Sequence, residues 1–206
     1  GIKKKDERKI LKWRLDKNIS GPSMILSEIG THAYHLLRYV TELEVKELAA
    51  EVNTLSKELT VDDNAFVLLR LNNNAKGAIW VSSAATGGEN GLKIRVYGTK
   101  GAVEWFQDDP NNLKFTELDK PTKIITRASK GVSNFSLTSS RLAAGHPEGF
   151  FEAFANIYTE FADIINMQSK KNIVPSYPTI DDGVKGIKFI FAAKKSSKLN
   201  SKWIKI

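Results

Sequence analysis

Three ionisable side chains lie close together in sequence near the N-terminus: Glu28, His32 and His35. Glu28 and His32 are four residues apart and share a face of an α-helix, and His35 lies three residues further on. A carboxylate beside an imidazole raises the imidazole pKa and can fix its tautomer, which suits a general acid–base. A half-buried pair on an amphipathic helix is the plainer interpretation. A metal site is a weaker alternative, because zinc needs three or four convergent ligands and no HExxH motif is present.

The remaining histidine, His146, stands between Gly145 and Pro147 just before another expected helix. Helix N-termini favour anions and hydroxyl-rich ligands, so His146 is a candidate substrate-binding residue, with an ordinary loop histidine as the alternative. Arg14 beside Trp13 could bind a ligand or simply pack, and nothing local decides between these roles. These residues form the candidate site together with the first helix.

Hydrophobic periodicity predicts the elements that position these side chains. A helix is expected from Pro22 to about Tyr39, and about six strands joined by tight turns follow between residues 45 and 126. Two more helices are expected, one beginning at Pro147 and one at Thr179. The order predicts an α+β fold with one open, mostly antiparallel sheet and helices packed on one face.

Three features predict how the helices pack. Gly30 lies inside the first helix, where glycine costs about 1 kcal/mol relative to alanine, which indicates a close neighbour. An aromatic stripe between Phe150 and Phe161 is expected to be core rather than a cofactor-binding surface. The last helix is expected to bury the face formed by Val184, Ile187, Ile190 and Phe191.

The composition narrows the class of protein. The chain has 206 residues, 41% hydrophobic and 26% charged, typical of one large or two small globular domains. The absence of cysteine excludes a disulfide framework, a thiolate nucleophile and cysteine-ligated metals, and fits a reducing compartment, so we expect the cytoplasm. No apolar run approaches the roughly 20 residues of a membrane span, so no membrane partner is expected.

The formal net charge of +8 invites a nucleic-acid interpretation, which its distribution does not favour. Residues 1–12 carry six basic and two acidic residues, and residues 194–206 carry five basic residues and none that are acidic. Residues 13–193 carry 20 basic against 21 acidic residues. A nucleic-acid domain places its charge on a face of the folded body. We therefore expect solvated ends, or ends that contact an acidic partner, and no nucleic-acid binding.

The glycine-rich segments do not read as nucleotide-binding motifs. Both Gly87–Gly91 and Gly98–Gly101 connect one expected strand to the next. A dinucleotide fingerprint instead leads from a strand into a helix N-terminus, where the pyrophosphate sits. Both segments are therefore expected to be hairpin turns.

Four segments together resemble the C-terminal domain of one family. They are Trp13–Asp16 (WRLD), Ser27–Leu36 (SEIGTHAYHL), Val96–Gly101 (VYGTKG) and Gly145–Phe154 (GHPEGFFEAF). The family is the glucose–fructose oxidoreductase/inositol dehydrogenase/rhizopine-catabolism (Gfo/Idh/MocA) oxidoreductases. The resemblance covers residues 13–195, which leaves residues 1–12 as a basic N-terminal segment and residues 196–206 as a basic tail.

The resemblance implies a substrate-binding domain that works with a separate Rossmann domain carrying NAD or NADP. Substrates would be sugars, inositols or related polyols, and the sheet face would form a homo-oligomer. By the same resemblance His32 handles the hydroxyl proton, and Glu28 stands where many members have Asp. Trp13, Arg14, His35 and His146 are the substrate-binding candidates.

The chain shows no counterpart of the family's glycine-rich turn, acidic ribose-binding residue or catalytic lysine segment. No cofactor is therefore expected to bind this chain alone, and no dehydrogenase activity is expected from it. It would be a fragment, a truncated product or one of two polypeptides. A non-enzymatic binding or assembly module that uses the sheet as an interface is the alternative.

Overall fold

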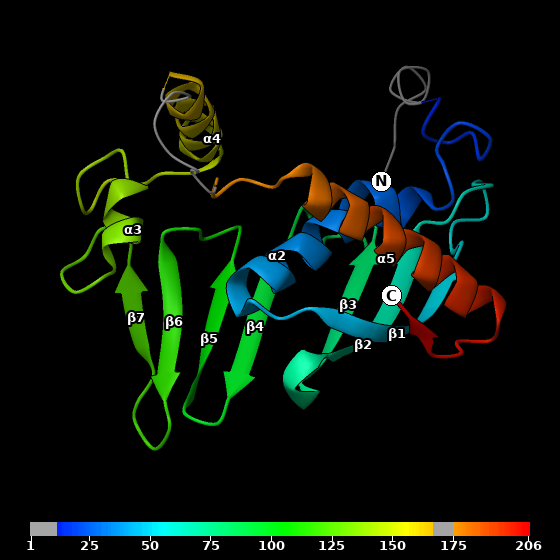
Figure 1. Ribbon diagram of the computed structural model, residues 1–206, viewed down its shortest axis with the longest axis horizontal. Coiled ribbons are helices and arrows are strands. Elements are labelled where there is room, and N and C mark those ends of the chain that lie inside the picture. The colour runs from blue at the N-terminus through cyan, green and yellow to red at the C-terminus, as the bar shows by residue number, and fades with distance from the viewer. Residues whose placement is uncertain (1–11, 167–174) are drawn as a thin grey trace. The chain divides into compact units, whose positions relative to one another are not determined.

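The computed structural model describes residues 12–166 and 175–206, which fall into two compact units. The first unit takes the chain up to Glu89 together with Ile180–Ile206, and the second runs from Asn90 to Thr179. Each unit has its own four-stranded antiparallel sheet (Figure 1). The predicted α+β class with antiparallel sheet and helices is confirmed, but the strands form two sheets where the sequence predicted one. The expected basic segment 1–12 lies outside the described residues except for Lys12.

The first sheet has the strand order β3-β2-β1-β8, with every neighbouring pair antiparallel. The chain's last residues supply its edge strand, so the segment predicted as a basic tail contributes a strand to this sheet. A short 3₁₀ turn, η2, joins β2 to β3. The bounds are Val45–Asn53 (β1), Asn64–Leu71 (β2), Asn72–Asn74 (η2), Lys76–Ser82 (β3) and Ile204–Lys205 (β8).

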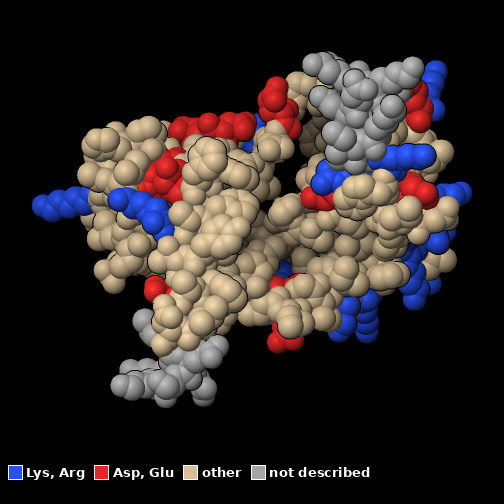
Figure 2. All heavy atoms as spheres, turned by 90° about the horizontal axis from the view of Figure 1, so that it is seen from above, with Lys and Arg blue, Asp and Glu red and all other residues tan. Residues whose placement is uncertain are grey.

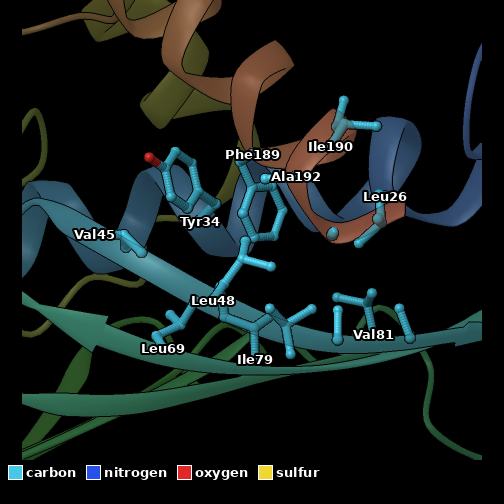
Figure 3. Close-up of a cluster of buried hydrophobic side chains, with 14 of the residues drawn as sticks. Leu26, Tyr34, Val45, Leu48, Leu69, Ile79, Val81, Phe189, Ile190 and Ala192 are labelled. Atoms are coloured by element: carbon cyan, nitrogen blue, oxygen red, sulfur yellow. The ribbon is translucent and has the colours of Figure 1, made fainter. Parts of the chain in front are cut away.

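Helices cover one face of this sheet. They are η1 (Leu26–Gly30), which leads directly into α2 (Thr31–Thr41), and the long α5 (Ile180–Lys198). The core lies between these helices and the strands, and Figure 3 shows Phe189 of α5 pointing toward the strand residue Leu48. Burying a side chain of this size stabilises the fold by roughly 1.5–3 kcal/mol. The first helix is therefore held on a rigid support.

The close neighbour predicted for Gly30 is present. A Cβ on Gly30 would lie 2.9 Å from the Leu26 Cδ2 and 3.6 Å from the Phe189 Cε1. Phe189 also stacks on Tyr34 of α2 with ring centroids 4.4 Å apart. The tight contact is with Leu26 of the same helix, whereas Phe189 of α5 lies at ordinary van der Waals distance.

The predicted buried face of α5 is wrong at three of its four positions. Val184, Ile187 and Phe191 are exposed, and only Ile190 is buried. The helix carries two apolar stripes, and the buried one contains small residues that allow close approach to the sheet. It comprises Gly186, Phe189, Ile190, Ala192, Ala193 and Ser196.

The second unit contains the sheet β4-β5-β6-β7 and two helices. Their bounds are Lys93–Gly98 (β4), Gly101–Phe106 (β5), Asn112–Glu117 (β6), Lys123–Thr126 (β7), Asn134–Thr138 (α3) and Phe150–Asn166 (α4). The two glycine-rich segments lie between β3 and β4 and between β4 and β5, as the sequence predicted.

The expectation that the aromatic stripe of α4 is core is wrong. The helix begins at Phe150 rather than Pro147, and none of its residues is buried. Phe151 is 84% exposed and Tyr158 is 68% exposed. Periodicity locates an apolar helix face correctly, but it does not reveal whether another surface covers that face.

The charges of the described residues are dispersed. In the face shown in Figure 2, Lys and Arg lie beside Asp and Glu, and uncharged residues cover most of the rest. Several C-terminal lysines belong to α5, and Lys194 is paired with the buried Asp62. Within residues 12–166 and 175–206, we find no helix with the length and apolar character of a membrane span.

Candidate functional site

Glu28 lies in a π-helical turn rather than in the regular α-helix that the sequence predicted. The Thr31 N–H donates to the Leu26 carbonyl five residues earlier, which closes η1 before α2 begins. Such turns are rare, and they occur frequently at functional sites. The wider turn alters the angular relation between Glu28 and His32 that an α-helix would have produced.

A buried polar network fixes the start of this helix. The Asp62 carboxylate accepts hydrogen bonds from the Ser23 Oγ at 2.6 Å and the Ile25 N–H at 3.0 Å. Lys194 of α5 donates to the other oxygen of Asp62 at 2.9 Å. A negative charge at a helix N-terminus satisfies free N–H groups and complements the helix dipole. The network thus ties the candidate helix to the β1–β2 connection and to α5.

The structure brings Trp13, Arg14 and Glu28 together. The Arg14 Nη1 lies 3.2 Å from the Glu28 Oε2, and the guanidinium carbon lies 5.2 Å from the centre of the Trp13 ring. The Arg14 Nε is buried and makes no hydrogen bond. Within the described residues the Glu28 carboxylate therefore pairs with Arg14 and makes no hydrogen bond to His32. Arg14 thus holds the carboxylate, and its buried Nε has no acceptor among the described residues.

His32 and His35 both lie on α2, in different surroundings. His32 is exposed, while His35 is half-buried and stacks on Tyr39 with ring centroids 6.2 Å apart. Burial lowers the pKa of His35, and the positive charges of Arg38 and His32 lower it further, against an opposing effect of Asp182. The His35 imidazole is thus mostly neutral at pH 7, whereas His32 is freely accessible to a ligand.

An ionic cluster anchors the C-terminal end of α2, the helix that carries both histidines. Arg38 donates to both Glu44 oxygens, at 2.8 and 2.7 Å, and to Asp182 at 3.0 Å. Lys185 also contacts the Glu44 carboxylate at 2.7 Å. The Arg38 hydrogen bonds lower the Glu44 pKa to about 2 and raise the Arg38 pKa. The cluster joins α2, the residue before β1, and α5.

His146 lies in the second unit, in the connection between α3 and α4. Its side chain is exposed, and its backbone carbonyl accepts a hydrogen bond from Arg127 at 2.5 Å. His146 and His32 belong to different units.

The sequence interpretation did not assign roles to Asn111, Arg127, Glu148, Asp62 or Arg38. Glu148 belongs to the GHPEG segment, so the motif could have identified it as a candidate. Arg38 pairs with Glu44 only six residues away, whereas the partners of Asn111, Arg127 and Asp62 lie 15 or more residues away, where no local sequence pattern indicates them.

The two glycine-rich segments were considered as phosphate-binding turns because of their glycines. Both glycine-rich segments connect strands, so neither leads into a helix N-terminus that could hold a pyrophosphate. In the described part of the chain, no group of three or more His, Asp or Glu residues is arranged to hold a metal ion.

The sequence profile of the Gfo/Idh/MocA oxidoreductases, described as the C-terminal alpha/beta domain of an oxidoreductase family, matches residues 2–206. The chain belongs to the Gfo/Idh/MocA family. The resemblance that the four sequence segments indicated is thereby confirmed. The match places the chain with the C-terminal alpha/beta domain of this oxidoreductase family.

Individual Gfo/Idh/MocA relatives agree in sequence and structure. The oxidoreductase YfiI of Bacillus subtilis strain 168 is 33% identical over 201 residues, covering 94% of this chain and 51% of YfiI. The crystal structure of an oxidoreductase from Sinorhizobium meliloti is 46% identical, with a TM-score of 0.83, covering 87% of this chain and 52% of that one.

A third relative carries ligands. The inositol dehydrogenase homologue from Azotobacter vinelandii, crystallised with NADH and myo-inositol, is 30% identical with a TM-score of 0.87. The match covers 96% of this chain and 52% of that protein. The chain therefore spans about half the length of these relatives.

Proposed function

We propose that this chain is the substrate-binding and oligomerising domain of an NAD(P)-dependent oxidoreductase that acts on a CH–OH group of a sugar, an inositol or a related polyol. The observation that carries the proposal is the similarity to a protein crystallised with NADH and myo-inositol. The exposed His32, four residues after Glu28 of the Arg14–Glu28 pair, gives the proposal a chemical site.

In this proposal His32 accepts or donates the hydroxyl proton of the substrate, because its imidazole is exposed on a helix that is firmly anchored. Glu28, held by Arg14, is a hydrogen-bond acceptor for a substrate hydroxyl. Trp13, His35 and His146 complete the substrate-binding candidates. NAD or NADP would supply hydride transfer, and we assign its binding to a Rossmann domain outside this chain, in the same polypeptide or a separate one. The cytoplasm remains the compartment we expect.

The catalytic role of His32 can be tested by reconstitution. The chain is mixed with the half of the A. vinelandii homologue that it does not cover, and NAD-dependent oxidation of myo-inositol is followed. His32→Ala should lower turnover by about 10²–10⁴-fold, the usual contribution of a general acid–base.

Val40→Ala, at an exposed position of α2 outside the site, is the matched control and should retain wild-type turnover. Unchanged turnover in the His32 variant would remove His32 from this role. A titration of NADH into the chain alone, followed by fluorescence, should show no micromolar binding. Tight binding there would contradict the assignment of the cofactor to another domain.

An exposed apolar surface on the first sheet favours the oligomerising part of the proposal. Phe66, Leu68 and Trp80 are each more than half exposed and lie on the face opposite the helices. The rings of Phe66 and Trp80 stack with centroids 6.0 Å apart. Exposed apolar patches of this kind mark interaction sites. A homo-oligomer through this sheet face accounts for it, and so would a purely assembly-related function without catalysis.

Replacing Trp80 by lysine should dissociate this oligomer, because a charge would be buried in an apolar contact. The oligomeric state is measured by sedimentation velocity over a range of protein concentrations. Tyr97→Lys, which changes an exposed aromatic residue of the second sheet, is the control. If the wild-type chain is already monomeric, or if both variants retain the oligomer, the proposed interface is wrong. A wild-type chain that forms the oligomer but binds no polyol would favour the assembly module.

A further inference from the structure

The loop that carries His146 is built around Arg127, the residue that follows β7. The Arg127 guanidinium donates to the carbonyls of Leu142 at 2.9 Å, Ala143 at 3.1 Å and His146 at 2.5 Å. Its side chain is only 14% exposed, although the chain around it is largely exposed. A single planar cation therefore fixes three backbone groups of residues 142–146.

Glu148 closes this network from the other side. Its carboxylate lies 3.1 Å from the Arg127 Nη1 and is only 8% exposed. The same carboxylate accepts the backbone N–H groups of Arg141, at 2.6 Å, and of Leu142. Both ends of residues 141–148 are thus bound to one buried ion pair.

Asn111, just before β6, connects the network to the sheet. Its side chain donates to the Glu148 carbonyl at 2.9 Å and accepts the Glu148 N–H at 3.0 Å. The Arg127 Nε also donates to the Asn111 Oδ1 at 3.2 Å. The loop is therefore held in one conformation relative to the strands of its own unit.

The network leaves the His146 imidazole exposed while it fixes the His146 backbone. Ordering each loop residue costs conformational entropy. Hydrogen bonds to the charged groups of Arg127 and Glu148 offset that cost. Residues 141–147 bury little, so their ordering adds little to the core. What the ordering provides is a fixed position for the side chain that the loop presents.

We propose that Arg127, together with Glu148 and Asn111, is the positioning residue that presents the His146 imidazole to a hydroxyl group of the polyol substrate. The proposal rests on the proposed function, in which His146 binds substrate. Arg127 acts through the loop and does not itself contact the ligand. A cavity of ≈ 380 Å³ adjoins Arg127 and Asn111, so direct contact between Arg127 and a ligand is the competing explanation.

A double-mutant cycle on the full chain separates these explanations. Dissociation constants for myo-inositol are measured for the wild type, Arg127→Met, His146→Ala and the double variant. Each single change should weaken binding about tenfold, and the double variant should be no weaker than His146→Ala. Additive losses would overturn the proposal, because Arg127 would then act independently of His146. Arg127→Lys should behave as Arg127→Met does, since an ammonium cannot replace the planar fork.

A second measurement tests the positioning without any ligand. The imidazole resonances of His32, His35 and His146 are recorded by NMR and assigned by single replacements. Arg127→Met should shift or split the His146 signal and leave the other two in place, which also shows that the variant folds. Lys130→Met removes an exposed cation from the connection between β7 and α3, which also contains Arg127. It should leave all three signals unchanged.

The two readouts distinguish failure of the proposal from failure of the proposed function. The wild-type chain could fail to bind myo-inositol while its His146 signal still responds to Arg127→Met. That result would contradict the proposed polyol substrate but support the positioning of His146 by Arg127. An unchanged His146 signal would overturn the positioning whatever the chain binds.

Discussion

Replacing Asp62 by alanine should lower the free energy of unfolding by about 3–5 kcal/mol, the cost of breaking a buried ion pair by removing one partner. Asp62 is 8% exposed and accepts hydrogen bonds from Ser23, Ile25 and Lys194. The truncation would leave the Lys194 ammonium, whose side chain is 25% exposed, without its partner. It would also leave the Ile25 N–H at the start of the first helix without its acceptor.

The loss is measured by urea unfolding followed by circular dichroism. Asp62→Asn keeps an acceptor and should lose less than Asp62→Ala. Adding Lys194→Met to Asp62→Ala should recover part of the loss, because the stranded charge is removed. Glu51→Ala in the same unit, which removes an exposed acceptor for Asn53, should change stability by less than about 1 kcal/mol. An Asp62→Ala variant as stable as the Glu51→Ala control would refute the capping role.

This network illustrates what the sequence could not reveal. The polar residue Ser23 and the helix that follows it were visible from local pattern. Asp62 is 39 residues away from Ser23, on the connection between β1 and β2. No periodicity couples the two positions, so the partner that anchors the candidate helix appears only in three dimensions.

The candidate site shows the same difference between features that local sequence patterns reveal and contacts between residues distant in sequence. The family, the α+β class and the close packing at Gly30 were all predictable, because motifs and helix-breaking residues are local signals. The pairing of Glu28 with Arg14 was not, because Arg14 lies 14 residues earlier and outside the helix. Local spacing thus identified candidate residues but not their partners.

The helices α4 and α5 show a second reason for failure. Each carries a strong apolar pattern, yet the stripe assigned to the core is exposed on both. In α5 the glycine and alanine positions select the buried side, because only small residues allow the backbone to approach the sheet. Hydrophobicity alone cannot rank two apolar stripes on one helix.

Replacing Arg38 by methionine should destabilise the first unit by about 2–4 kcal/mol at pH 7, since the buried guanidinium anchors two carboxylates. Its side chain is 8% exposed, and it bonds Glu44 through both oxygens and Asp182 through one. This value is kept below the full cost of a broken buried pair because the Glu44 side chain is 47% exposed.

The effect should depend on pH in a defined direction. Arg38, with a smaller contribution from Lys185, lowers the Glu44 pKa from 4.5 to about 2, so the interaction stabilises the fold fully above the unfolded-state pKa. That stabilisation is lost as the pH falls from about 4.5 to about 2. The stability difference between wild type and Arg38→Met should therefore shrink over this interval.

Urea unfolding at pH 7, 5, 4 and 3 measures this difference. Lys185→Met provides the matched control, since it removes a 43% exposed cation from the same Glu44 carboxylate. An exposed pair contributes about 0–1 kcal/mol, so the control should be far milder at every pH. A difference between wild type and Arg38→Met that stays constant down to pH 3 would show that Arg38 stabilises the fold through packing on Tyr34 rather than through its carboxylate partners.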